Sequence, residues 1–166
     1  TATVTGTTFS WTATANGPVT GFTPSGTSQI PAETLSVPAG ATGYVTYLII
    51  PSFTGGTSCP GAPTEYRIYV NPQGQVNPAS NQVTCNGASQ PGISFSTPGT
   101  VGTTTFTWSN NNISIGLAAS GNGSLPSFTA ANAGTAPVVA TITVTPHLSN
   151  NNVVCVGTPE TFTITV

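Results

Sequence analysis

The feature that most limits what this chain can fold into is an internal repeat. The stretch 103–146 has a counterpart in 7–51, and its aromatic pair, Phe106 and Trp108, appears 97 positions earlier as well. Other matched pairs keep the register to within two residues: Ser25-Gly26 with Ser120-Gly121 and Pro51 with Pro146 at 95, and Cys59 with Cys155 and Val70 with Val166 at 96. Solenoid repeats are shorter, at about 20–50 residues. The period therefore predicts two tandem domains, each near the roughly 100 residues of an immunoglobulin-like sandwich.

The repeat places the domain boundary near residue 71. We expect a first unit at 1–71 and a second at 72–166, with the first lacking about a dozen residues at its front, as in a piece of a longer protein. The stretch 71–80 contains two prolines, which predicts a semi-rigid connector between the units.

Both units are predicted to consist of short strands separated by turns that contain Gly and Pro. Their β-branched and aromatic residues nearly alternate with polar ones, and no segment has a sustained helical period. In the first unit the expected strands are 2–11, 33–37, 43–50 (stopped by Pro51) and 66–70. In the second they are 82–85, 93–95, 103–108, 113–117, 127–129, 138–145 and 160–166. The predicted fold class is all-β, as two β-sandwiches.

Charged residues are almost absent. The chain has one Lys or Arg and three acidic residues, 2% in total, where about 25% is usual. A single cation cannot neutralise a phosphate backbone or an anionic lipid surface, so we expect no nucleic-acid partner. No apolar run is long enough to span a bilayer, so no membrane insertion is expected.

The same scarcity argues against catalysis. The carboxylates Glu33, Glu65 and Glu160 form no local pair in the sequence, and a glycosidase needs two facing one bond. The single histidine, His147, has no Asp for a Ser-His-Asp arrangement and too few neighbouring ligands for zinc. We therefore predict no enzyme activity, no cofactor and no metal site, with His147 a loop residue at a strand end.

Three cysteines invite a disulfide prediction. Cys85 lies near the start of the second unit and Cys155 just before its last strand, so a Cys85–Cys155 bond would tie the ends of one sandwich. Such a bond would stabilise the unit by roughly 4 kcal/mol in the chain-entropy model. Cys59 would be unpaired or bonded to a residue outside this sequence. The alternative is three reduced, buried cysteines.

The two units differ on their outward positions. Strand 140–145 alternates inward apolar residues with outward threonines, and the first unit has four other residues where the last two strands of the second have outward Thr: Leu48, Ile50, Arg67 and Tyr69. Apolar side chains with Arg and Tyr are typical of interface cores. This patch is predicted to contact an adjacent domain or another copy of the chain; the alternatives are dispersed exposed residues and a glycan site using Tyr69.

Trp11 and Trp108 occupy equivalent places in the two units. A ligand-stacking role is one interpretation, but immunoglobulin-like sandwiches commonly bury one Trp. We predict that both belong to the cores.

Four segments carry a resemblance to a known family: TTFTW at 104–108, GLAASGNGSLPSFTAAN at 116–132, ATITVTP at 140–146 and CVGTPETFTITV at 155–166. They resemble the PKD-like, immunoglobulin-like repeats of large surface adhesins in Bacteroidetes-type bacteria, including gliding-motility adhesins secreted by the type IX route. The resemblance implies an extracellular, cell-surface segment that acts as spacer and adhesion module or filament component. Its partners would be neighbouring repeats, copies of itself or surface glycans. The alternative function is a carbohydrate-binding β-sandwich module.

Overall fold

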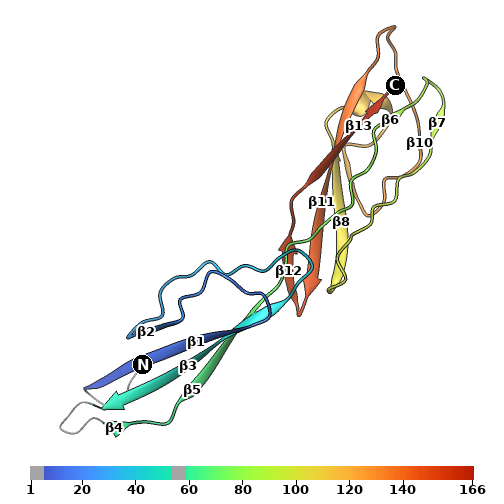
Figure 1. The fold of residues 1–166 in the computed structure, drawn as a ribbon. Helices are drawn as coiled ribbons and strands as arrows, with labels where there is room; N and C mark the ends of the chain where they lie inside the picture. Colours follow the sequence, from blue (N-terminus) through green and yellow to red (C-terminus); the bar gives the residue numbers. More distant parts are fainter. Residues whose placement is uncertain (1–5, 54–58) are drawn as a thin grey trace. The chain divides into compact units, whose positions relative to one another are not determined.

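The chain forms two compact units, Thr1–Pro72 (unit 1) and Gln73–Val166 (unit 2), in a computed structural model that describes residues 6–53 and 59–166 (Figure 1). The described residues are all-β apart from one short 3-10 turn. No helix among them is long and apolar enough to cross a membrane.

Unit 1 is built on a sheet in which β3 lies between β1 and β5 (Figure 1). Its strands are β1 (Thr7–Asn16), β2 (Ser25–Thr27), β3 (Gly43–Phe53), β4 (Cys59–Pro60) and β5 (Thr64–Val70). All pairings are antiparallel, and β2 extends the sheet beyond β1.

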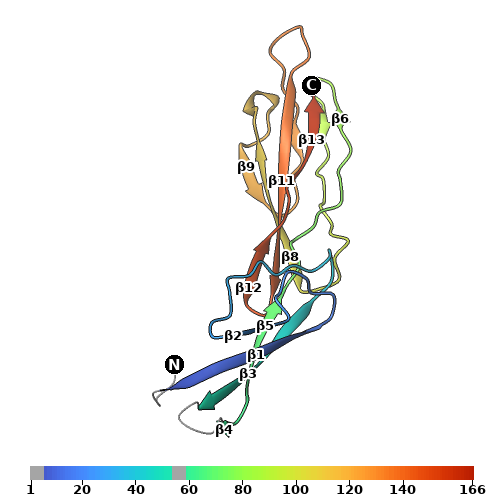
Figure 2. The ribbon, with the colours of Figure 1, turned by 60° about the vertical axis from the view of Figure 1, so that its left-hand side comes forward.

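Unit 2 has a larger sheet with the order β6-β13-β11-β8-β9, centred on the long strand β11 (Figure 2). A hairpin strand, β12, also pairs with β11, and β7 pairs with β10 in a second small sheet. The bounds are β6 (Gln82–Val83), β7 (Ser89–Gln90), β8 (Thr103–Asn110), η1 (Ile113–Ile115), β9 (Ser120–Asn122), β10 (Phe128–Thr129), β11 (Val139–Asn150), β12 (Val153–Val156) and β13 (Glu160–Thr165).

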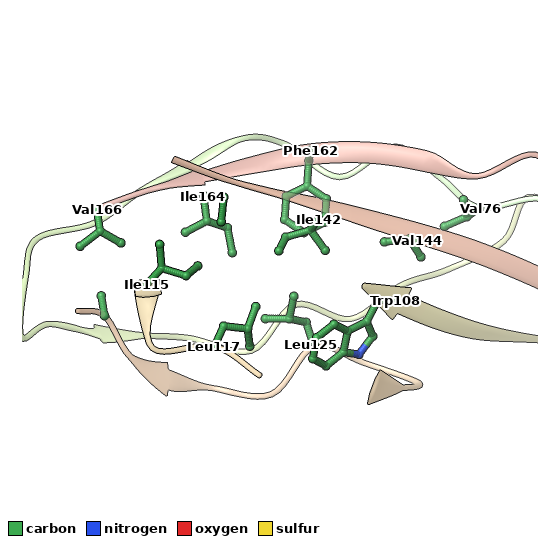
Figure 3. Close-up of a cluster of buried hydrophobic side chains, with 12 residues drawn as sticks. Val76, Trp108, Ile115, Leu117, Leu125, Ile142, Val144, Phe162, Ile164 and Val166 are labelled. Carbon is green, nitrogen blue, oxygen red and sulfur yellow. The ribbon is translucent and has the colours of Figure 1, made fainter. Parts of the chain in front are cut away.

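The core of unit 2 lies between two layers of backbone (Figure 3). Phe162, Ile164 and Ile142 enter it from the large sheet, while Leu117 and Leu125 enter from the opposite layer. All five are at most 3% exposed. This two-layer packing is consistent with the β-sandwich expected from the strand pattern.

Both units use the same strand register. Each unit has a tryptophan on one strand and another aromatic residue on a second strand. Both residues pair with the long central strand between them, at equivalent positions in the two units. The matched pairs are Trp11 with Ile49 and Tyr47 with Tyr66 in unit 1, and Trp108 with Val144 and Ile142 with Phe162 in unit 2. Residues that face each other across an antiparallel pair lie on the same side of the sheet. The sequence repeat is therefore matched by a repeat of side-chain placement.

Pro51 does not end its strand, contrary to the sequence expectation, and Pro146 likewise lies inside β11. Each proline sits where the neighbouring strand is interrupted: β3 pairs with β5 up to Ile49 and with β4 from Ser52. The proline carbonyls accept bonds from Gly61 and Gly157 at 2.8 and 2.9 Å. A missing N–H costs a sheet little where the ladder is already broken.

The segment 113–117, expected as a strand, is the 3-10 turn η1 followed by Gly116. The Asn112 side chain accepts from the Ser114 N–H at 3.1 Å, and Gly116 adopts the left-handed conformation with φ of 92°. Short polar caps and a left-handed glycine favour a turn over a strand.

The expected connector, 71–80, is largely part of unit 2. Val76 is 9% exposed in the core, and a Cβ on Gly74 would lie 2.9 Å from the Pro146 carbonyl oxygen. Because this segment is packed against β11, it does not act as a free spacer.

Candidate interaction surface

The outward face of the unit 1 sheet carries the four residues of the predicted patch. Leu48 and Ile50 on β3 are half-buried, whereas Arg67 and Tyr69 on β5 are exposed. The inward neighbour Tyr47 is fully buried, so the alternation along β3 places the four side chains on one face. That this face is an interface remains a prediction.

The structure adds two residues to this face, Tyr44 and Glu65. Tyr44 pairs with Tyr69 across the sheet, with ring centroids 5.3 Å apart and planes tilted by 50°. The Arg67 guanidinium lies 5.4 Å from the Tyr44 ring centroid and 3.1 Å from a Glu65 oxygen. We call Tyr44, Glu65, Arg67 and Tyr69 the tyrosine–arginine cluster.

Electrostatics in the tyrosine–arginine cluster are local. The Glu65 carboxylate raises the pKa of Arg67 above its already high ordinary value, and the pair has no net charge. Exposed pairs of this kind contribute little to stability because water screens them. The cluster therefore exposes aromatic surface and hydrogen-bond donors, and it produces no strong electrostatic field. The two-residue alternation along β3 and β5 could have identified Tyr44 and Glu65 from the sequence.

A second polar contact of unit 1 lies on the inward side of β3. The Tyr47 hydroxyl donates to one carboxylate oxygen of Glu33, and the Thr23 N–H donates to the other at 2.7 Å. These bonds, the one from Tyr47 first, lower the pKa of Glu33. Burial and the neighbouring carboxylate raise the pKa of Tyr47 to about 12. The ionised Glu33 carboxylate therefore accepts a hydrogen bond from the neutral Tyr47 hydroxyl, which gives this buried hydroxyl a partner.

The carboxylates considered for catalysis are dispersed. Glu33 bonds to Tyr47 and Glu65 to Arg67, while Glu160 begins β13 in unit 2. Within the described residues no group of three or more His, Cys, Asp or Glu side chains could hold a metal ion.

His147 lies inside β11, not at a strand end as expected. Its Nε2 is 3.0 Å from the Thr107 hydroxyl on β8, so the ring is held by a neighbouring strand. The expectation failed because Pro146 was taken to end the strand.

The predicted Cys85–Cys155 disulfide is wrong for this structure, in which both cysteines are free. Cys85 follows Thr84, whose N–H donates to the Thr165 carbonyl. Thr165 in turn pairs with Val139, at one end of β11. Cys155 pairs with Leu148 near the other end. At the rise of a strand, the part of β11 between Val139 and Leu148 spans about 30 Å, so Cys85 and Cys155 lie about that far apart. Bridged cysteines have Cα atoms within about 7 Å of each other.

Cys59 is an exposed free cysteine on β4. Its bond to a residue outside this sequence stays a prediction.

Trp11 and Trp108 are 3% and 5% exposed and pack in the two cores. Their rings lie against glycines of the adjacent edge strands: a Cβ on Gly26 or Gly121 would lie 2.5 or 2.4 Å from the ring. Each indole Nε1 is buried without a hydrogen-bond partner among the described residues. This position leaves no face of either ring for stacking on a ligand.

Comparison with known families gives one match. Residues 1–74 match the family model of a PKD-like domain, so this part of the chain is similar to such domains. No curated protein matches the chain. The match covers unit 1 and ends two residues into unit 2.

Proposed function

We propose that this chain is a segment of an extracellular surface protein, in which two tandem PKD-like domains act as spacer and adhesion module. The family match over residues 1–74 supports a module of structural or adhesive type. The common strand register supports a second domain of the same kind in unit 2. The domains at 1–71 and 72–166, the bacterial cell-surface location and the partners, neighbouring repeats or copies of the chain, belong to this proposal.

The observation that carries the proposal is the parallel pairing of the first and last strands of unit 2. Gln82 lies opposite Ile164 and Val83 opposite Thr165. Tension applied to the two ends of unit 2 pulls β6 and β13 in opposite directions along their lengths. Their hydrogen bonds are then loaded together in shear rather than opened one at a time. This is the arrangement that a load-bearing spacer needs.

Two further hydrogen bonds reinforce this pairing, one to a side chain and one within the backbone. The Asn81 side chain accepts from the Thr163 N–H at 2.9 Å, and the Thr84 N–H donates to the Thr165 carbonyl at 2.9 Å. Because both bonds connect the β6 region to β13, they must break before unit 2 extends.

Single-molecule force spectroscopy of the whole chain tests the proposal. Extension of Gln73–Val166 should release about 300 Å of chain in one step. Asn81→Ala should lower the force of that step. Asn86→Ala is the matched control, because its side chain also accepts one backbone N–H bond at 2.9 Å, from Asn132, and neither of these residues belongs to β6 or β13. Equal effects of both variants, or extension of unit 2 without a force peak, would refute the load-bearing role.

A carbohydrate-binding module is the second candidate function. The tyrosine–arginine cluster favours it, because Tyr69 is 64% exposed beside Tyr44. The 50° tilt between the rings departs from a flat stacking platform. Selective binding on a glycan array that disappears in Tyr69→Ala would establish this function. Absence of binding across the array leaves the spacer proposal.

A further inference from the structure

The outward face of the unit 1 sheet differs from that of unit 2 in three cross-strand rows. The rows of unit 2, formed by β11 and β13, are Val139–Thr165, Thr141–Thr163 and Thr143–Thr161. The equivalent rows of unit 1, formed by β3 and β5, are Tyr44–Tyr69, Thr46–Arg67 and Leu48–Glu65. Aromatic and charged side chains thus stand in unit 1 where unit 2 has mostly threonine.

The exposure of this outward face is a property of the fold. In unit 2 the segment 73–98 packs on the inner face through Val76 and Phe95. The outward face stays open beside it, since Val139 is 50% exposed. In unit 1 Tyr69, in the equivalent row, is 64% exposed. A segment on the inner face therefore does not decide whether a ligand can reach Tyr69.

Half of the charged residues of the chain meet on this face. The chain has one basic and three acidic residues, and the basic one, Arg67, lies 3.1 Å from an oxygen of Glu65. The two side chains are 48% and 56% exposed. Ion pairs this exposed add little to stability, because water screens them. Folding therefore does not explain why the pair lies beside two tyrosines.

The side chains of the tyrosine–arginine cluster hold one another in place. The Arg67 guanidinium lies 5.4 Å from the Tyr44 ring centroid, and the Tyr44 and Tyr69 centroids are 5.3 Å apart. Glu65 first, and the two tyrosines to a smaller extent, raise the pKa of Arg67. Side chains that are ordered before a ligand arrives lose less entropy on binding. Because Arg67 lies against Tyr44, the ring left open to a ligand is that of Tyr69.

We propose that the tyrosine–arginine cluster binds one neutral sugar residue of a glycan, with the pyranose ring against Tyr69 and two adjacent hydroxyl groups on Arg67 and Glu65. A guanidinium only donates hydrogen bonds and a carboxylate only accepts them, whereas a hydroxyl does both. Adjacent hydroxyls can therefore accept from Arg67 and donate to Glu65 at the same time. Since the ion pair has no net charge, an anionic ligand would have to displace Glu65.

The size of the face favours a small ligand over another protein chain. The sheet has β1, β3 and β5 side by side, and β5 is seven residues long. With strands about 4.8 Å apart and a rise of about 3.3 Å per residue, this face measures about 330 Å². A specific protein–protein interface buries about 800 Å² on each partner. A sugar residue stacked on one ring fits within the available area.

This inference rests on the proposed function, since it specifies how an adhesion module of this kind would hold a glycan. The force experiment concerns unit 2 and does not involve the outward face of unit 1, so the two ideas can fail separately. If no sugar binds while Asn81→Ala lowers the unfolding force, the spacer role stands and the sugar site is rejected.

The probes are the methyl glycosides of glucose, galactose and mannose, titrated into the whole 166-residue chain and followed by saturation-transfer NMR. We expect at least one of them to bind saturably with a Kd of about 1 mM, as suits a ligand of so few atoms. Its permethylated derivative keeps the ring but has no hydroxyl donor, and it should not bind. Equal binding of the glycoside and its permethylated form would overturn the proposal.

Protein variants separate the stacking ring from the ion pair. Tyr69→Thr removes the ring, and Arg67→Lys keeps the charge but loses the planar fork of donors. Each should weaken binding by about tenfold. Glu65→Gln, which removes one negative charge from the site, should do the same. Glu160→Gln is the matched control, because it removes the same charge from an exposed position at the start of β13 in unit 2; it should leave the affinity unchanged.

Tyr66→Thr is a second control, because Tyr66 projects from the opposite face of β5. It should not alter sugar binding, and thermal unfolding checks that every variant stays folded. Equal losses for Tyr66→Thr and Tyr69→Thr, or an affinity that Arg67→Lys does not change, would overturn the proposal. So would tighter binding of a methyl glucuronide, which is anionic, than of the neutral glycosides. A dimer in sedimentation that Tyr69→Thr dissociates would instead assign the face to a second copy of the chain and would also reject the sugar site.

Discussion

The contact between Trp108 and Gly121 makes a sharp prediction about packing. Gly121 on β9 lies opposite Trp108 on β8, and the indole ring covers the place where a side chain would start. An added Cβ would lie 2.4 Å from Cζ2, 2.7 Å from Cε2 and 3.0 Å from Nε1. Carbon atoms prefer about 3.5–4.0 Å, so Gly121→Ala must displace the ring or the strand.

The expected cost follows from two opposing effects. Overpacking a core costs about 1–3 kcal/mol, while replacing a glycine stabilises by about 0.4–1 kcal/mol through the unfolded chain. The net loss should be about 1–2 kcal/mol, which lowers the melting temperature of a domain of this size by about 5–10 °C. Gly26→Ala should act in the same way on unit 1, because its Cβ would lie 2.5 Å from the Trp11 ring.

Urea unfolding followed by tryptophan fluorescence measures this loss. In a Trp11→Phe background, Trp108 reports on unit 2 alone. Gly134→Ala is the control, because its Cβ would meet nothing nearer than the Asn132 side-chain oxygen at 3.5 Å. That variant should stay within about 0.5 kcal/mol of the parent. An unchanged midpoint for Gly121→Ala, or equal losses in both variants, would refute the reasoning.

Three other outcomes are expected. The pKa of Glu33 is lowered by the bond from Tyr47 from its ordinary 4.5, so the carboxylate stabilises unit 1 above that pH. Stability should fall as pH drops through the lower folded pKa, and urea unfolding of Glu33→Gln should show a smaller drop. The pKa of Tyr47 is raised from 10.0 to about 12, so the neutral hydroxyl stabilises below pH 10 and its contribution disappears as pH rises to about 12; Tyr47→Phe should remove this alkaline loss. Phe162→Ala should destabilise unit 2 by about 3–5 kcal/mol, whereas chemical denaturation should show less than about 1 kcal/mol for Tyr66→Ala in unit 1, because Phe162 is 3% exposed and Tyr66 58%.

Local alternation was enough to predict much of the fold. The burial of Trp11 and Trp108 and the inward position of Tyr47 agree with a period of two along strands that are buried on one face. The outward positions of Leu48 and Arg67 follow from the same rule. These properties belong to single strands, so the sequence can reveal them.

The two predictions that were wrong, a strand end at Pro146 and a Cys85–Cys155 disulfide, both depend on how neighbouring strands pair. Whether Pro146 interrupts β11 depends on where β13 gives way to β12, because a proline is tolerated where no ladder bond is lost. Whether Cys85 can meet Cys155 depends on the order and direction of strands around β11. Both answers require pairings between segments far apart in the chain, and neither leaves a local sequence signal.

The environment of Tyr66 also could not be predicted from the sequence. In the sequence it is an ordinary exchange for Phe162, and the repeat comparison therefore singled out the outward residues Arg67 and Tyr69 instead. The structure separates the two residues by their surroundings, because Phe162 is 3% exposed beside Phe95 whereas Tyr66 is 58% exposed. Because Tyr66 and Tyr69 project from opposite faces of β5, substitutions at these two positions probe the inward and the outward face of unit 1 separately.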